Sequence, residues 1–315
     1  MRALVFTEPG QIVLREEPAP VLGPQETLVQ VMSSGICGSE LHGFRSLGMR
    51  RPPLIMGHEF AGLTPDDIRV VANPLLSCGH CHACRAGRPQ ICEVRGLLGV
   101  TRPGGFAEQV GVPTSCLQTL PASVGWTAAA LIEPLANAVH AWGLAQEVRG
   151  PVAIIGAGSI GLVCLQVAQR RELGSVVVVE PSPERRQVAE HLGAVTVPSL
   201  DEFSGEGFEV IIDAVGLPET RRASVAQLRP GGSAVWIGLL APEAAIDGND
   251  LVRAEKKVMG SFAYTPGEFA AAVDLAGVLD FSWATDVSLS DSQTVFMELA
   301  QGRRDIIKAV LRPEH

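Results

Sequence analysis

Four cysteines, a residue type suited to bind zinc or iron, stand close together between positions 78 and 92. They are Cys78, Cys81, Cys84 and Cys92, in the pattern C-x₂-C-x₂-C-x₇-C. Intervals this short allow one loop to surround a single ion with four thiolates, which is the closed tetrahedral arrangement of structural zinc. An iron–sulfur cluster is the alternative, because ferredoxins also use cysteines at this spacing. The spacing predicts a bound metal, and we expect His80 and His82 in the same loop to be solvated.

A second set of metal-binding side chains is spread over three separate segments. Cys37 lies in the segment 35–42, His58 and Glu59 lie in the segment 57–62, and Glu133 opens the segment 133–136. Cysteine, histidine and glutamate together are suitable ligands for a catalytic zinc that keeps one exchangeable position. Each residue alone has an ordinary structural explanation, but their presence beside the cysteine cluster favours a second zinc.

A glycine-rich turn predicts a dinucleotide site. Gly156, Gly158 and Gly161 form G-x-G-x-x-G, with Ser159 and Ile160 between the last two glycines. An apolar strand is predicted just before this turn, at 152–155, and a helix follows it. The first glycine permits the tight turn, the second lets a pyrophosphate approach the backbone, and the third lets the helix pack on the strand. The phosphates would then bind the unpaired N–H groups of the helix.

The choice of nucleotide depends on the residues after the next predicted strand. Glu180 ends that strand, where a carboxylate would accept hydrogen bonds from the adenine ribose hydroxyls. A carboxylate there also repels a 2′-phosphate, which favours NAD over NADP. Arg185 and Arg186 follow closely, and a nearby arginine can accommodate the extra phosphate, so NADP stays open as the alternative.

These residues need two kinds of scaffold to position them. The first part of the chain reads as short strands separated by turns, whereas strands and helices alternate between about 150 and 260. Such alternation is typical of a doubly wound α/β domain with a parallel sheet. The predicted strands are 3–6, 27–31, 70–72, 107–112, 152–155, 176–179, 210–213, 234–238 and 309–311. Helical spacing covers 127–144, where Glu133 and Pro134 would start a new helix with proline in its first turn, and the other predicted helices are 160–171, 184–192, 266–276 and 290–301.

Composition limits the function classes. The chain has 315 residues, of which 46% are hydrophobic and 19% charged, so it can bury the cores of about two domains and is not a disordered protein. Its formal net charge of −9 argues against a nucleic-acid partner. No apolar run reaches the roughly 20 residues of a membrane helix, and the first residues are unlike an export signal. We therefore expect a cytoplasmic protein with no membrane partner.

Taken together, the segments resemble the zinc-dependent medium-chain dehydrogenase/reductase family. The match covers nearly the whole chain, and the Glu-Pro-Leu segment resembles the polyol and threonine dehydrogenase branch. The motifs occur in the family's order: G-I-C-G-S at 35–39, G-H-E-F-A-G at 57–62, the four cysteines, G-G-F-A-E at 104–108, E-P-L-A at 133–136, the glycine turn, D-A-V-G at 213–216 and R-P-G-G at 229–232.

The resemblance implies a fold and a division of labour. It implies an α/β protein with a GroES-like β-barrel catalytic domain at 1–135 and 264–315, and a Rossmann NAD-binding domain at 136–263. Cys37, His58 and Glu59 would bind the catalytic zinc, and Glu133 would be a further ligand or an acceptor for a water at the metal. The implied cofactor site consists of Gly156, Gly158, Ser159, Ile160, Gly161, Glu180, Arg185, Ala214, Val215, Ile237 and Gly238.

The implied reaction transfers a hydride between a secondary alcohol or polyol, or its ketone, and NAD. Zinc acts as a Lewis acid on the alcohol oxygen. Ser39 would take the hydroxyl proton, and a cofactor ribose and His42 would lead it to solvent. The alternative is a catalytically impaired nucleotide-binding member of the family with a regulatory or structural role.

Some features depart from the family pattern or concern association. Glu40 stands where the family usually has aspartate, and the segment 63–70 replaces a longer region with two more strands. We expect Arg45, Arg50 and Arg51 to form a solvated basic loop, with a substrate carboxylate or phosphate as their alternative partner. The resemblance also implies a homodimer or homotetramer, in which the strand at 234–237 and the edge at Leu239 and Leu240 would extend a sheet across a two-fold axis.

Overall fold

The computed structural model describes residues 1–145, 148–203, 205–303 and 305–314. The chain divides into two compact units. Met1–Glu133 and Thr265–His315 form the first unit, and Pro134–Tyr264 forms the second. The first unit therefore contains both ends of the chain and every residue of the two candidate metal sites, with Glu133 at its boundary.

The second unit is built on one sheet of six parallel strands in the order β13-β12-β11-β14-β15-β16. The strands are β11 (Val152–Ile155), β12 (Val176–Val179), β13 (Val195–Val197), β14 (Phe208–Asp213), β15 (Leu228–Trp236) and β16 (Lys257–Gly260). In chain order this is the 3-2-1-4-5-6 arrangement of dinucleotide-binding folds, with the reversal between β11 and β14. The structure thus confirms the predicted doubly wound domain.

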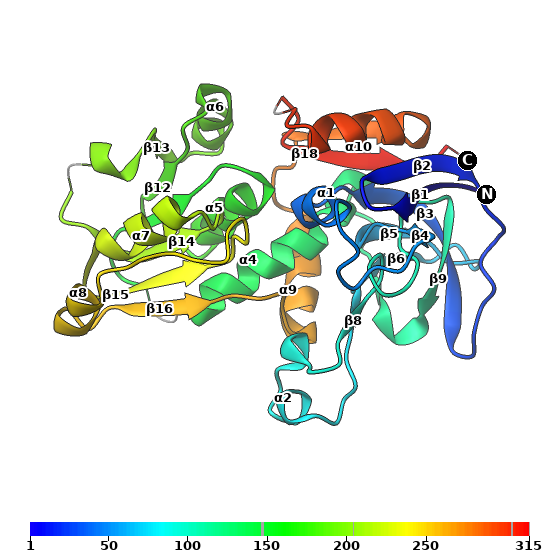
Figure 1. The fold of residues 1–315 in the computed structure, drawn as a ribbon, viewed down its shortest axis with the longest axis horizontal. Coiled ribbons are helices and arrows are strands. Elements are labelled where there is room, and N and C mark those ends of the chain that lie inside the picture. Colours follow the sequence, from blue (N-terminus) through cyan, green and yellow to red (C-terminus); the bar gives the residue numbers. More distant parts are fainter. Residues whose placement is uncertain (146–147, 204, 304, 315) are drawn as a thin grey trace. The chain divides into compact units, whose positions relative to one another are not determined.

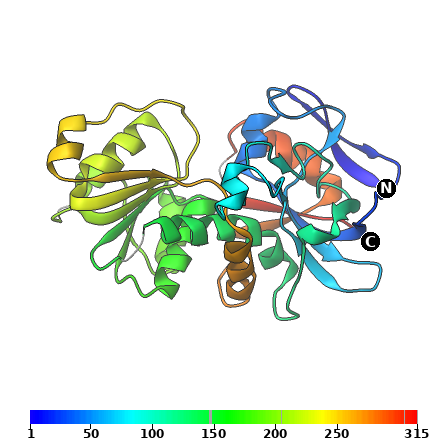
Figure 2. The same cartoon turned by 90° about the horizontal axis from the view of Figure 1, so that it is seen from below.

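Helices cover both faces of this sheet (Figure 2). They are α4 (Ile132–Leu144), α5 (Ser159–Arg170), α6 (Pro183–His191), α7 (Pro218–Ala226) and α8 (Gly248–Arg253). Coverage on both sides explains the unbroken valine run of β12, since every residue of that strand is buried. α5 begins directly after the glycine turn, with Gly158 as its N-cap.

The first unit holds a large mixed sheet in the order β10-β6-β5-β3-β18-β17, with β9 also paired to β3. A three-stranded sheet, β2-β1-β4, and the short pair β7-β8 complete it. The strands are β1 (Arg2–Glu8), β2 (Gln11–Glu16), β3 (Glu26–Gly35), β4 (Leu54–Ile55), β5 (Glu59–Leu63), β6 (Arg69–Ala72), β7 (Leu75–Leu76), β8 (Gly96–Leu97), β9 (Gln109–Pro113), β10 (Leu117–Thr119), β17 (Ala284–Ser288) and β18 (Lys308–Arg312).

The helices of the first unit are α1 (Gly38–Gly43), α2 (His82–Arg85), α3 (Trp126–Ala130), α9 (Pro266–Ala276) and α10 (Ser292–Ala300). α1 is too short to be stable by itself, so its place depends on packing. Phe44, which follows α1, packs edge-on against Phe296 of α10 at 5.2 Å between ring centroids. The two aromatic rings belong to one buried cluster with Phe6 and Phe106, which anchors α1 to the rest of the unit. The ribbon shows α1 next to α10 (Figure 1).

The shortened region after Gly62 keeps the sheet intact. β5 and β6 pair as an antiparallel hairpin, and β5 also pairs with β3, where Glu59 lies opposite Gly35. Thr64 closes the turn: its N–H donates to the Ile68 carbonyl at 3.0 Å and its hydroxyl accepts from the Ile68 N–H at 3.2 Å. The tight turn therefore holds Glu59 in a paired strand without the two strands that the family usually adds.

The predicted sheet edge at 234–237 is wrong. β15 pairs with β14 on one side and with β16 on the other, so its backbone groups are already used within the sheet. β16 is the last strand on that side in the described part of the chain.

The described helices include none with the length and apolar character that crossing a membrane requires.

The third glycine of the turn provides a test of this packing. A Cβ at Gly161 would collide with the Gly156 carbonyl oxygen and lie 2.8 Å from its carbon, and backbone atoms cannot move aside cheaply. We expect Gly161→Ala to lose about 2–3 kcal/mol of unfolding free energy. Gly158→Ala is the matched control, because no atom lies within 4 Å of its Cβ position, and it should change stability by no more than about 0.5 kcal/mol. Urea unfolding followed by circular dichroism measures both, and equal losses would contradict the packing argument.

Candidate active site

Three side chains from two segments converge at the start of β5. The ligand atoms of Cys37, His58 and Glu59 all lie within 4.8 Å of one another. Cys37 caps the N-terminus of α1, while His58 and Glu59 stand at the entry to β5, where both are buried. A thiolate, an imidazole and a carboxylate at this separation are a suitable donor set for one zinc ion with an open position.

Glu40 joins the two segments. Its carboxylate accepts hydrogen bonds from the Cys37 N–H at 3.0 Å and the Gly57 N–H at 2.9 Å, and it lies 3.0 Å from Nδ1 of His58. Burial raises the pKa of Glu40, but His58 and the Cys37 N–H outweigh it and hold the pKa below its usual value. With Nδ1 bonded to Glu40, Nε2 of His58 is the nitrogen left for a metal. The longer glutamate thus serves in place of the family's aspartate.

Lys308 is a part of this centre that sequence reasoning missed. Its ammonium forms an ion pair with the Glu59 carboxylate, and both side chains are almost completely buried. Burial lowers the pKa of Lys308, yet the charges of Glu59, Cys37 and Glu40 raise it above the usual lysine value. The signal was available in the sequence, because Lys308 is a lone charge inside the apolar run 306–311.

The charges of this buried centre balance when a divalent cation is counted. The Cys37 thiolate, Glu40 and Glu59 supply three negative charges, and Lys308 with one divalent ion supplies three positive ones. Gly35, opposite Glu59, leaves the room for this arrangement: a Cβ there would collide with the Glu59 carboxylate and lie 3.0 Å from Cε of Lys308. The donor set and the charge balance both fit zinc.

The three residues predicted to act in catalysis differ in their exposure and in the helix that carries them. Ser39 is exposed in the first turn of α1, and its hydroxyl lies 3.3 Å from Sγ of Cys37. His42 is exposed on the same helix. Glu133 is buried in the first turn of α4 and is not among the side chains whose ligand atoms cluster within 4.8 Å in the described chain. Its role as a ligand or acceptor stays a prediction.

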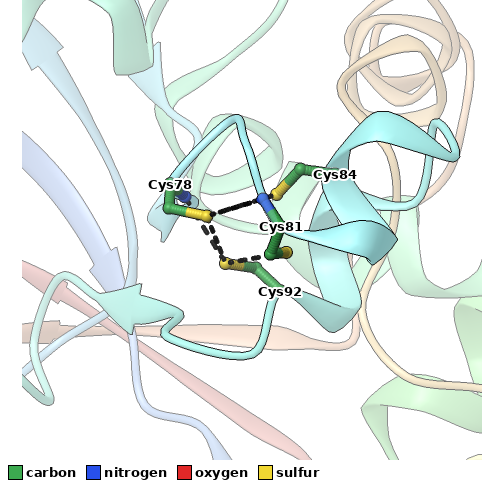
Figure 3. Close-up of side chains that lie close together, drawn as sticks. All are labelled: Cys78, Cys81, Cys84 and Cys92. Carbon is green, nitrogen blue, oxygen red and sulfur yellow. Dashed lines mark hydrogen bonds between the residues drawn. The ribbon is translucent and has the colours of Figure 1, made fainter.

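The four cysteines converge in the loop that connects the paired strands β7 and β8 (Figure 3). Sγ of Cys92 lies 3.6 Å from Sγ of Cys78 and 3.9 Å from Sγ of Cys81, and Cys78 and Cys84 are 4.0 Å apart. A tetrahedron with zinc–sulfur bonds of about 2.3 Å has edges of about 3.8 Å, so these separations fit a single ion. Backbone N–H groups of Cys84 and Glu93 lower the pKa of Cys81 to about 6, which favours the thiolate.

A single ion explains these distances better than an iron–sulfur cluster, which distributes the four cysteines over two or four irons and holds sulfurs on different irons farther apart. His80 is exposed, and its Nδ1 lies 2.8 Å from the Cys78 carbonyl oxygen. Neither His80 nor His82 belongs to the cluster in the described chain.

The predicted nucleotide residues meet at the carboxyl ends of β11, β14 and β15. Gly156 has a φ of +98°, and the Val215 side chain occupies the space beside it. Asp213 accepts hydrogen bonds from the N–H groups of Val215 and Gly216, both at 2.9 Å, and its carbonyl accepts from Ile237 and Gly238. Burial raises the pKa of Asp213. One buried aspartate therefore holds the turn at 214–216 against the turn at 237–238.

Glu180 is tied to the glycine turn. Its carboxylate accepts from the Ala157 N–H at 2.9 Å and from the Ser182 N–H at 3.0 Å, and the residue is buried. Nη1 of Arg186 donates to the carbonyls of Glu180 and Pro181, which holds its guanidinium against the backbone. Within the described chain, Arg185 has no such side-chain bond, so it is the arginine of the pair whose guanidinium is available to a ligand.

Comparison with known proteins supports this architecture. Residues 159–277 match the family model of zinc-binding dehydrogenases, and residues 23–122 match that of the alcohol dehydrogenase GroES-like domain. L-threonine 3-dehydrogenase of Streptomyces coelicolor is 33% identical over 96% of this chain and 97% of its own. L-galactonate-5-dehydrogenase of Escherichia coli is 32% identical over 86% and 85% of the two chains. The chain belongs to the zinc-dependent medium-chain dehydrogenases.

Solved structures of this dehydrogenase family agree in fold. A zinc-binding dehydrogenase from Sinorhizobium meliloti bound to NADP superposes with a TM-score of 0.92 at 27% identity, covering 99% of both chains. An alcohol dehydrogenase from Escherichia coli CFT073 complexed with NADH gives 0.91 at 26% identity, again over 99% of both. Galactitol-1-phosphate dehydrogenase from Escherichia coli gives 0.90 at 27% identity, over 99% of this chain and all of the other.

The expectation of a solvated basic loop after α1 is wrong for one of its three arginines. Arg51 is exposed and donates to the carbonyls of Gly48 and Arg50 at 3.2 and 2.9 Å, and Arg45 is exposed and bonds the Ala300 carbonyl. Arg50 is only 8% exposed. The loop turns back on itself through the Arg50 N–H, which donates to the Leu47 carbonyl at 2.7 Å, and this turn directs the Arg50 side chain inward.

The ion pair of Lys308 and Glu59 makes a stability prediction for this dehydrogenase. Lys308→Met leaves the buried Glu59 carboxylate without its partner, so the zinc-depleted protein should lose about 3–5 kcal/mol of unfolding free energy. The double variant Lys308→Met/Glu59→Gln removes both charges and should recover much of that loss. Urea unfolding in the presence of a chelator measures both variants. An equal loss in the single and the double variant would show that packing, and not the charge pair, sets the effect.

Proposed function

We propose that this dehydrogenase oxidises a secondary alcohol or polyol with NAD, or reduces the corresponding ketone. The observation that carries the proposal is the convergence of Cys37, His58 and Glu59, with the Ser39 hydroxyl 3.3 Å from the Cys37 sulfur. We assign catalysis to residues 1–135 and 264–315 and nucleotide binding to residues 136–263. The names of the relatives support the substrate class, because threonine, galactonate and galactitol 1-phosphate all carry a secondary hydroxyl.

The chain's own residues divide the remaining work. Cys37, His58 and Glu59 would hold the zinc, which would supply the Lewis acidity that lowers the pKa of the substrate hydroxyl. Ser39 accepts the proton of that hydroxyl and passes its own to a cofactor ribose hydroxyl, from which His42, three residues on and exposed, leads a proton to solvent. Glu40 and Lys308 keep His58 and Glu59 in place, and Glu133 is the second candidate for holding the proton.

The nucleotide preference follows from Glu180. Its buried carboxylate, tied to the glycine turn, occupies the position that contacts the adenine ribose and disfavours a 2′-phosphate. Arg185 is the residue that argues for NADP. The two structural neighbours with bound nucleotide differ, one holding NADP and the other NADH.

We also propose a homodimer or homotetramer. Support comes from the resemblance and from Leu239 and Leu240, which are 77% and 49% exposed, although β15 itself is not an edge strand. Sedimentation of a monomer at micromolar concentration would contradict this assignment.

A screen of secondary alcohols with NAD and with NADP, on protein whose metal content is measured, tests the proposed reaction. We expect two zinc ions per chain, reduction of the nicotinamide with at least one alcohol, and kcat/KM at least about tenfold higher with NAD, or roughly 1.4 kcal/mol. Iron with sulfide would contradict the zinc assignment of the four-cysteine loop. Equal kcat/KM with both nucleotides would show that Arg185 compensates for Glu180.

Ser39→Ala tests the proton route separately. Loss of the hydroxyl should lower kcat for alcohol oxidation by roughly 10²–10⁴-fold, the usual range for a general acid–base group. Zinc content and NAD affinity should stay unchanged, because neither depends on that hydroxyl. His42→Ala should lose less, since water can also carry the proton, and higher pH should restore part of its rate. Near-normal turnover by Ser39→Ala would contradict the role of Ser39 as proton acceptor and make Glu133 the next candidate for that role.

A further inference from the structure

Arg50 is a buried cation without a partner. It is 8% exposed, its Nε is shielded from solvent and donates to nothing, and its side chain forms no hydrogen bond or ion pair within the described ranges. The neighbouring arginines of the loop, Arg45 and Arg51, both bond backbone carbonyls. A largely buried charge without a partner costs stability, and the Nη atoms of Arg50, which are not among the shielded unpaired atoms, are available to a ligand.

Gly43 makes room for this guanidinium. A Cβ at position 43 would collide with Nη1 of Arg50 and would lie 2.8 Å from Cζ and 2.9 Å from Nη2. The guanidinium therefore occupies the space in which any other residue at this point of α1 would place its side chain. Arg50 and Gly43 together place a positive charge on one particular face of α1.

That face is the one that carries Ser39. Ser39 and Gly43 are four residues apart in α1, and residues at that spacing lie on one side of a helix. The bond from Cα to Cβ tilts toward the N-terminus of a helix, so the space filled by the guanidinium points toward Ser39. The distance along the helix is about one turn, roughly 5.4 Å.

We propose that Arg50 binds an anionic group of the substrate, a carboxylate or a phosphate, a few carbon atoms from the hydroxyl that reacts beside Ser39. Guanidinium donors match the oxygens of both anions, and such charge-assisted bonds are among the strongest polar contacts. A net charge of −9 opposes the approach of anions, so a local cation favours their binding. The proposal rests on the proposed alcohol oxidation and assigns to it a specificity residue.

Three compounds with related skeletons provide the test: galactitol, which is neutral, galactonate, which is a carboxylate, and galactitol 1-phosphate. Calorimetric titration of the zinc-loaded protein without nucleotide measures their binding, and turnover with NAD measures kcat/KM. We expect one of the two anions to exceed galactitol by at least about tenfold in affinity, the scale of a charged hydrogen bond. The anion that binds more tightly shows whether the substrate group at Arg50 is a carboxylate or a phosphate.

Variants test whether Arg50 causes the preference for anions. Arg50→Met should bring the ratio of anion affinity to galactitol affinity close to one. Arg50→Lys should keep part of this preference, and the control Arg51→Met should keep all of it. Because Arg50→Met removes an unpaired buried charge, its melting temperature should not fall. A lower melting temperature with an unchanged ratio would make Arg50 a structural residue and overturn the proposal.

Two further outcomes separate this proposal from its basis. Equal binding of all three compounds by the unmodified protein would overturn the role of Arg50, whereas weaker NAD binding by Arg50→Met with an unchanged ratio would place the guanidinium on the nucleotide. If neither galactitol nor neutral diols such as 2,3-butanediol nor the two anions are oxidised, the proposed reaction fails. The titrations still decide the anion site in that case, because they need no turnover.

Discussion

The candidate active site depends on one buried carboxylate. Glu40 accepts the N–H groups of Cys37 and Gly57 and lies against Nδ1 of His58, so it connects the start of α1 with the entry to β5. A carboxylate away from water must find donors, and here those donors are the backbone and side chain of the residues that must converge. Lys308 extends the same rule to Glu59 from a third segment, β18. The ligand set is thus held in place by polar contacts within the fold.

The second unit is organised by close backbone approach instead of charge. The glycine turn after β11 allows α5 to pack on it, since a Cβ at Gly161 would collide with the Gly156 carbonyl. The turns after β14 and β15 also touch through glycines, because a Cβ at Gly216 would lie 2.7 Å from the Leu239 nitrogen. Asp213 ties these two turns together. Glycines that were identified from sequence as a nucleotide motif are therefore also required by the packing of the sheet ends.

The sequence was most informative where spacing alone fixes structure. The valine run of β12, the proline in the first turn of α4 and the interval of the four cysteines all predicted local geometry that the structure contains. It was less informative where a residue's environment comes from distant segments. The partner of Lys308 lies almost 250 positions earlier in the chain, and whether β15 is an edge depends on the pairing of β16. The basic loop was predicted to be solvated because composition does not show which of three arginines the loop turns inward.

Two buried cations of the first unit differ in a way that bears on specificity. Lys308 is neutralised within the fold by Glu59, so its charge contributes to the metal site and not to ligand choice. Arg50 has no such carboxylate in the described chain, and its guanidinium fills the space left by Gly43 on the Ser39 face of α1. Pairing Arg50 internally would have stabilised the protein but would have satisfied the donors that an anion needs. Lys308, which is paired within the fold, is therefore a structural residue. Arg50, which lacks an internal partner among the described residues, is the residue that can select a ligand.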